Sequence, residues 1–261
     1  MELLKKGMSI IKGCGIIRLS TEPLHDYFAA LNICLGRFKI RHLAAIILSL
    51  VVSWWFYVPI HELSHALGCI IGGGQVSRLE IATIYGADFL KGFFPFVESG
   101  SKYAGRLSGF DTHGSDLTYL LTDFFPYILT IVFGVPLLKS VTSRNAAPLI
   151  NSIIFGISMP FAYAPFISVT GDFYEMGSIL VSRVAALLAP SVSPERWRSD
   201  DLFKLTERLF FSNGVQWVPD IIVVVASFLL GVVLIFAVYW AGAIWTKFTV
   251  SMKKSIKGAL T

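Results

Sequence analysis

The sequence has few charged residues and few cysteines. Asp, Glu, Lys and Arg make up only 15% of its 261 residues, against about 25% in an average soluble domain. The three cysteines are odd in number and follow no spacing pattern, so no disulfide framework is expected. Lys12 interrupts the first apolar stretch, so we expect no cleavable signal peptide. Hydrophobic residues make up 54% of the chain and gather in long runs, which predicts an integral membrane protein and excludes a sizeable soluble domain.

The formal net charge of +5 comes from basic residues near the two ends of the chain. Basic segments that flank apolar runs are typical of contact with anionic lipid headgroups. No RNA- or DNA-binding signature accompanies them, so we expect the lipid bilayer as a partner and no nucleic acid. The residues concerned are Lys5, Lys6, Lys12, Arg18, Arg37, Lys39, Arg41, Lys247, Lys253, Lys254 and Lys257.

The apolar runs predict an all-α membrane protein, a polytopic helical bundle of about five transmembrane segments, within a range of four to six. Five full spans would put the two basic ends on opposite sides of the membrane, so either one segment is re-entrant or the first run is two segments. The pattern sets no oligomeric state. The expected spans are residues 43–71, 117–138, 146–168, 173–190 and 221–245.

The chain divides into three expected parts. Residues 1–40 mix basic and apolar residues and predict an interfacial amphipathic segment. Residues 41–250 form the membrane-embedded domain, and residues 251–261 a basic tail. Two non-spanning regions interrupt this domain, a loop region at 75–116 and a charged amphipathic connection at 191–218.

Proline and glycine mark the end of the first apolar run. Pro59 is expected to kink its helix, and Gly72-Gly73-Gly74 to end it. A short β-strand is predicted at 75–84, where β-branched residues partly alternate with polar ones. The Gly-rich, polar residues 85–116 are expected to be a long loop.

The motif His61-Glu62-Leu63-Ser64-His65 lies inside the first apolar run. Residues four apart share a helix face, so both imidazoles can bind one metal ion. Glu62 can then hold and deprotonate a water on that metal. Zinc suits these ligands, keeps one position open and lowers the pKa of its water to about 7. Ionisable groups in an apolar run are costly and usually functional, so one Zn²⁺ per chain is favoured over two histidines that cap a kinked span.

A catalytic zinc with two histidines needs a third protein ligand. His25, His42 and His113 lie in segments interpreted as interfacial or loop. Asp172 is the favoured ligand, because it lies between two apolar segments, where a carboxylate needs a partner. Glu175 is the competitor, three residues further along the same helix face. Both acids are also typical of a helix start.

The stretch from His61 to Gly68 within a span, Gly73-Gly74 before a strand and a late aspartate resemble the site-2 protease family of intramembrane metalloproteases, over roughly residues 43–190. The resemblance implies zinc on His61, His65 and Asp172, with Glu62 as general base. It makes residues 41–250 a metalloprotease domain and implies a membrane-protein substrate. In the family's second motif the order is Asp-Gly, whereas this chain has Gly171-Asp172.

Further polar residues each allow two interpretations. The strand from Val76 to Ile84 offers an unwound substrate an edge to pair with, or is an ordinary strand in a small sheet. Asn151 binds substrate or the oxyanion, or makes an interhelical hydrogen bond. Asp123 lines a water path, or stabilises the helix break at Pro126, which is favoured. An interfacial aromatic belt without a catalytic role is predicted for Trp54, Trp55 and Tyr57.

The favoured function is an intramembrane zinc metalloendopeptidase that hydrolyses peptide bonds in or near transmembrane segments, with water activated by zinc and Glu62. One alternative is a proteolytically inactive membrane scaffold or adaptor of the same fold, although a structural metal site has no need of Glu62. Another is a membrane transporter, because broken helices and midplane carboxylates suit ion coupling, although no inverted repeat is visible. Glu175 on the zinc would favour a prenyl-protein-type membrane metalloprotease.

Overall fold

The structure is a computed structural model that describes residues 15–36, 39–143, 146–188, 193–199, 202–209 and 217–259. Helices dominate it, and a small sheet follows the helix that carries His61, Glu62 and His65. The elements in chain order are α2 (Gly15–Leu35), α3 (Ile40–Ile71), β1 (Gln75–Ile81), η2 (Thr83–Tyr85), α4 (Ala87–Lys91), β2 (Val97–Ser99), β3 (Gly105–Asp111), α5 (Asp116–Phe124), η3 (Phe125–Tyr127), η4 (Thr130–Gly134), α6 (Val135–Ser143), α7 (Pro148–Ile167), α8 (Asp172–Leu188), η5 (Pro194–Trp197), α9 (Leu202–Glu207) and α10 (Trp217–Ala259).

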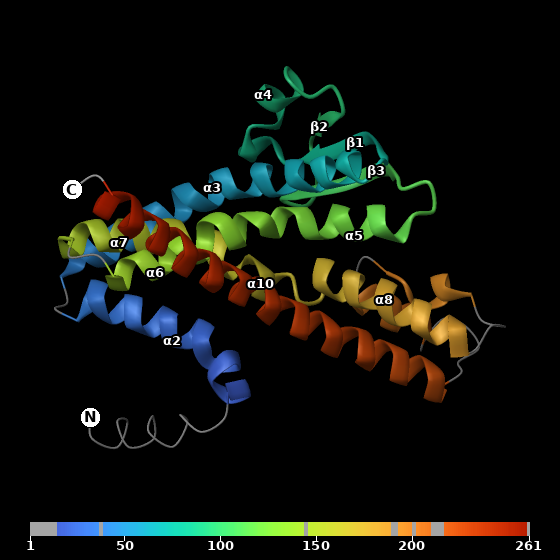
Figure 1. Cartoon of the computed structure of the whole chain (residues 1–261). Helices are drawn as coiled ribbons and strands as arrows, with labels where there is room; N and C mark the ends of the chain where they lie inside the picture. The colour runs from blue at the N-terminus through green and yellow to red at the C-terminus, as the bar shows by residue number, and fades with distance from the viewer. Residues whose placement is uncertain are drawn as a thin grey trace.

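Four helical stretches among the described residues are long and apolar enough to cross a membrane: Ile40–Ile71, Asp116–Ser143, Pro148–Leu188 and Pro219–Met252. The predicted all-α polytopic bundle with a small β region is confirmed. Figure 1 shows α7 and α8 following one another along the bundle, so the two segments predicted at 146–168 and 173–190 form one pass. The start of α3 and the end of α10 lie at the same end of the bundle (Figure 1). Four passes therefore remove the orientation conflict that five spans create.

The first apolar run is one continuous helix, α3, which contains Pro59. It ends at Ile71 with Gly72 as its C-cap, so the predicted end of the helix at Gly72-Gly73-Gly74 is confirmed. Gly73 has a φ of 86°, a left-handed conformation that glycine adopts without strain, so the chain can turn from the helix into β1. At the other end of the chain, α10 continues to Ala259 through most of the predicted tail. Of the predicted interfacial segment, the described part is largely the helix α2.

The prediction of a long loop over residues 85–116 is wrong for most of this region, because the region contains α4, β2 and β3. The three strands form one sheet in the order β2-β1-β3, with β2 parallel and β3 antiparallel to β1. Short strands with several glycines give a weak period-two signal, and their pairing is set by contacts distant in sequence. For the same reason, the sequence did not predict the two short helices η5 and α9, which lie in the predicted connection at 191–218.

The sheet packs directly on the motif of α3. Leu63, between Glu62 and Ser64, contacts a small apolar core formed by the sheet and α4. The fully buried side chains of that core are Leu79, Ile81, Ala87 and Val97. Burial of this apolar surface fixes the sheet over one turn of α3, and Figure 1 shows the sheet beside α3 at the edge of the bundle.

Glycines let the helices approach closely where the site is built. A Cβ at Gly68 of α3 would lie 2.4 Å from the backbone oxygen of Leu121 in α5, so only glycine fits this contact. A Cβ at Gly177 of α8 would lie 2.2 Å from the backbone oxygen of Ser227 in α10. The first contact places the α5 backbone against the histidines of α3, and the second fixes α8, which begins with Asp172.

Candidate metal centre

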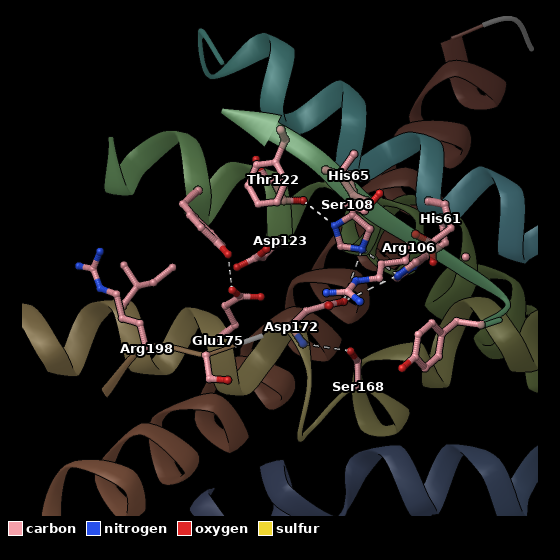
Figure 2. A pocket seen from close by; sticks show the side chains of 18 of the residues that line it. His61, His65, Arg106, Ser108, Thr122, Asp123, Ser168, Asp172, Glu175 and Arg198 are labelled. Carbon is pink, nitrogen blue, oxygen red and sulfur yellow. Dashed lines mark hydrogen bonds and ion pairs between the residues drawn. The ribbon is translucent and has the colours of Figure 1, made fainter. Parts of the chain in front are cut away.

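Two helices bring three potential metal ligands together. The Nε2 atoms of His61 and His65 lie 3.1 Å apart, and the Oδ2 atom of Asp172 lies 3.7 Å from each of them. Figure 2 shows the two imidazoles on α3 facing Asp172 at the start of α8. Within the ranges that the structure describes, this is the one cluster of histidine, cysteine and acidic side chains found close enough to hold a metal ion.

Hydrogen bonds to the far side of each ring orient the histidines. His65 Nδ1 lies 2.8 Å from the backbone oxygen of Thr122 in α5. A carbonyl only accepts, so Nδ1 carries the proton of neutral His65 and Nε2 presents a lone pair to the cluster. His61 Nδ1 lies 2.6 Å from the hydroxyl of Tyr57, one helical turn earlier. Beyond the aromatic belt predicted for it, Tyr57 therefore also contacts a candidate metal ligand.

Asp172 owes its place to a break in the third pass. The helix α7 contains Pro160 and Pro165 and ends at Ile167, and α8 starts at Asp172 after a short turn. The backbone N–H of Asp172 donates to Ser168 Oγ at 3.3 Å. The hydroxyl of Tyr127, from the 3-10 turn η3, donates to Asp172 Oδ2. Asp172 accepts this hydrogen bond as a carboxylate, and the same Oδ2 atom faces both histidines.

The cluster opens into a cavity of about 620 Å³, which Glu62 also lines. Glu62 extends toward β3, where Gly105 leaves just enough room for it. A Cβ at position 105 would lie 2.2 Å from Glu62 Cγ and 2.6 Å from Cδ. The strand backbone therefore packs on the glutamate, which sits next to a metal ligand in sequence and faces the same cavity.

The strand β3 forms one wall of the cavity through Gly105, Arg106, Leu107, Ser108 and Phe110. Within the described sheet β3 is an edge strand that pairs only with β1. The β1 strand, within the predicted edge Val76–Ile84, is central in the sheet: it pairs with β3 along its length and with β2 over Leu79–Ile81. Of the two interpretations of this segment, the structure bears out the ordinary strand in a small sheet. The unpaired edge beside the metal cluster belongs to β3.

The other candidate ligand and the candidate substrate residue lie outside the cluster. Glu175 lines the cavity but accepts a hydrogen bond of 2.5 Å from the hydroxyl of Tyr119. Asn151 lies in the first turn of α7 and donates to the backbone oxygen of Ala146 at 3.4 Å. Seventeen residues, about 25 Å of helix, separate it from Ser168, which lines the cavity. Asn151 therefore lies outside this cavity, and its binding of substrate stays a prediction.

Two residues of the site were missed or misjudged from the sequence. Tyr127 gives no sequence signal, because its partner Asp172 is 45 residues away. Asp123, favoured as a support for the break at Pro126, lines the cavity. The signal for Asp123 was present, since a carboxylate in an apolar span usually faces a cavity or a partner.

Comparison with models of known protein families found no match to this chain, and comparisons with curated proteins and with solved structures likewise found none. The chemistry assigned to the site therefore rests on the geometry of its own residues.

Proposed function

We propose that the chain is a multi-pass intramembrane zinc metalloendopeptidase, which hydrolyses peptide bonds in or near transmembrane segments of other membrane proteins. The observation that carries the proposal is the convergence of His61, His65 and Asp172 with Glu62 in one cavity within apolar helices. Polar groups of this kind are costly at membrane depth and are found where function requires them.

The separations of the candidate ligand atoms are close to those of a zinc site and support zinc as the metal. Zinc bonds to nitrogen and oxygen are about 2.0–2.2 Å long, so ligand atoms of a tetrahedral site lie roughly 3.3–3.6 Å apart. The observed separations are 3.1 Å between the two histidines and 3.7 Å from Asp172 to each. His61, His65 and Asp172 would hold the metal. When bound, zinc lowers the pKa of water to about 7 and polarises a carbonyl.

Glu62 is proposed as the general base. It lines the same cavity as the three candidate ligands, where it would hold a water in front of the cluster. Its carboxylate accepts a proton from this water as the water oxygen bonds to the scissile carbonyl carbon. The same carboxyl returns the proton to the amide nitrogen as the C–N bond breaks, so that one peptide bond and one water give a carboxylic acid and an amine.

The strand β3 is proposed to hold the substrate. A transmembrane helix satisfies its own backbone hydrogen bonds and must unwind before its carbonyl groups can be attacked. The open edge of β3 offers backbone donors and acceptors to such an unwound segment. Since β3 packs on Glu62 at Gly105, a segment paired with β3 passes directly before the general base.

The test is metal content followed by cleavage. We expect about one zinc per chain in the protein purified in detergent, lost in His61→Ala and Asp172→Ala and kept in Glu175→Ala. Glu62→Gln should keep zinc but lose cleavage of a panel of single-span reporter proteins reconstituted with it in liposomes. Cleavage by Glu62→Gln at the wild-type rate would overturn the mechanism, and a wild type that binds no zinc after remetallation would overturn the proposal as a whole.

A further inference from the structure

Asp123 is a buried acid that the proposed reaction does not use. It lies in the last turn of α5, and its residue is 4% exposed. Its Oδ2 atom is buried and has no hydrogen-bond partner in the structure. The side chain lines the cavity of the metal cluster. A buried carboxylate oxygen without a donor costs several kcal/mol, so a ligand in the cavity is the natural source of that donor.

A second acid faces the same space. Glu175 of α8 lines the cavity and is 8% exposed. Figure 2 shows its carboxyl group beside that of Asp123, on one side of the metal cluster. Tyr119 donates to Glu175 at 2.5 Å. A pair of acids in a space of low dielectric attracts a cation far more strongly than a neutral donor.

Three basic residues, Arg106, Arg198 and Lys204, line the cavity, but the orphan oxygen of Asp123 accepts a hydrogen bond from none of them. The guanidinium of Arg198 makes two hydrogen bonds of 2.9 Å to the carboxylate of Asp116. This bidentate arrangement uses two N–H groups on one edge of the guanidinium and fixes its direction. Asp116 also accepts a hydrogen bond from Arg183, so its one carboxylate is shared by two guanidinium groups.

We propose that Asp123 and Glu175 form a subsite for a cationic side chain, lysine or arginine, of the substrate polypeptide next to the scissile bond. The inference rests on the proposed function, because it takes the peptide to lie against the metal cluster. An ammonium or guanidinium group donates several hydrogen bonds and matches the charge of the acid pair. The subsite makes the protein selective for transmembrane segments with a basic residue at the cleavage site.

Two peptidyl hydroxamates that differ in one side chain test the subsite. The hydroxamate group binds zinc, and the adjoining side chain is either lysine or its uncharged analogue norleucine. We expect the lysine compound to bind wild-type protein on the order of tenfold more tightly. Asp123→Asn should remove this difference and leave the affinity for the norleucine compound unchanged.

Two further variants complete the test. Asp88→Asn removes the same charge from an exposed position in α4 outside the cavity and should keep the lysine preference, whereas Glu175→Gln should weaken it. If wild-type protein binds the lysine and norleucine compounds with equal affinity, this measurement alone overturns the proposal. The proposal is also overturned if Asp123→Asn still binds the lysine compound more tightly than the norleucine compound. It is overturned as well if wild type binds a second zinc ion per chain and Asp123→Asn loses that ion. If the norleucine compound does not bind wild type, the proposed function fails and the subsite with it.

Discussion

On the proposed function, replacing Gly105 by alanine should abolish cleavage without unfolding the protein or releasing the zinc. The new Cβ would lie 2.2 Å from Glu62 Cγ and 3.0 Å from Oε1. Carbon atoms that are not bonded approach one another to about 3.5–4.0 Å. Either the new Cβ or the Glu62 side chain therefore has to move by roughly 1 Å or more. The obstacle is a side chain with rotatable bonds, so Glu62 leaves its place beside the cluster and the strand stays.

The expected magnitudes differ between stability and activity. Turning Glu62 out of a preferred rotamer costs about 0.5–1.5 kcal/mol, and alanine is otherwise tolerated in a strand, so the thermal midpoint should change little. General base catalysis contributes roughly 10²–10⁴-fold to a rate. Since the base is displaced and not removed, we expect Gly105→Ala to lose about 100-fold or more in the cleavage rate.

The assay compares cleavage rate, zinc content and thermal midpoint in the same preparation. Gly92→Ala is the matched control, because the nearest atom to its Cβ would lie 3.3 Å away, on the backbone of Phe89 and outside the cavity. It should behave as wild type in all three measurements. Wild-type cleavage by Gly105→Ala would refute the placement of Glu62 under β3. Loss of zinc in that variant would show that Gly105 supports the ligands and not the base.

Two substitutions test the surroundings of the site, and a labelling experiment tests the burial of Cys34 in α2. Tyr57→Phe removes the hydrogen bond to His61 and should lower zinc affinity about 10–100-fold, measured by competition with a chelator. Tyr127→Phe removes the donor to Asp172 and should lower the affinity for zinc in the same assay. Unchanged zinc affinity in both variants would contradict the assigned contacts. Burial raises the pKa of the Cys34 thiol, so its maleimide labelling, followed by peptide mass spectrometry, should be slow at pH 7.5 and speed up as pH rises; fast labelling at pH 7.5 would contradict its burial.

The features predictable from the sequence are those set by local spacing or by the cost of a polar group in lipid. His61 and His65 share a helix face because they are four residues apart, whatever the rest of the fold does. Asp172 was favoured over Glu175 because it lies between two apolar segments, and it is the acid that the structure places beside both histidines. The end of α3 at Gly72 followed from glycine chemistry alone.

The features that escaped prediction depend on contacts between distant segments. Asn151 and Asp123 are both polar residues in apolar spans, and only the packing of the helices puts Asp123 at the cavity and Asn151 far from it. Strand order is equally non-local. The residues of β1 carry the stronger strand pattern, yet pairing with β2 and β3 makes β1 the central strand of the sheet.

On the proposed function, the sheet and the metal cluster depend on each other. An intact transmembrane helix offers the cluster no accessible carbonyl carbon, since its backbone groups are paired internally. Unwinding one turn leaves several backbone groups without partners, each at a cost of several kcal/mol in hydrocarbon. The free edge of β3 restores part of these hydrogen bonds inside the cavity. A proline in β3, which removes a backbone donor, should therefore slow cleavage of helical substrates more than cleavage of substrates already extended.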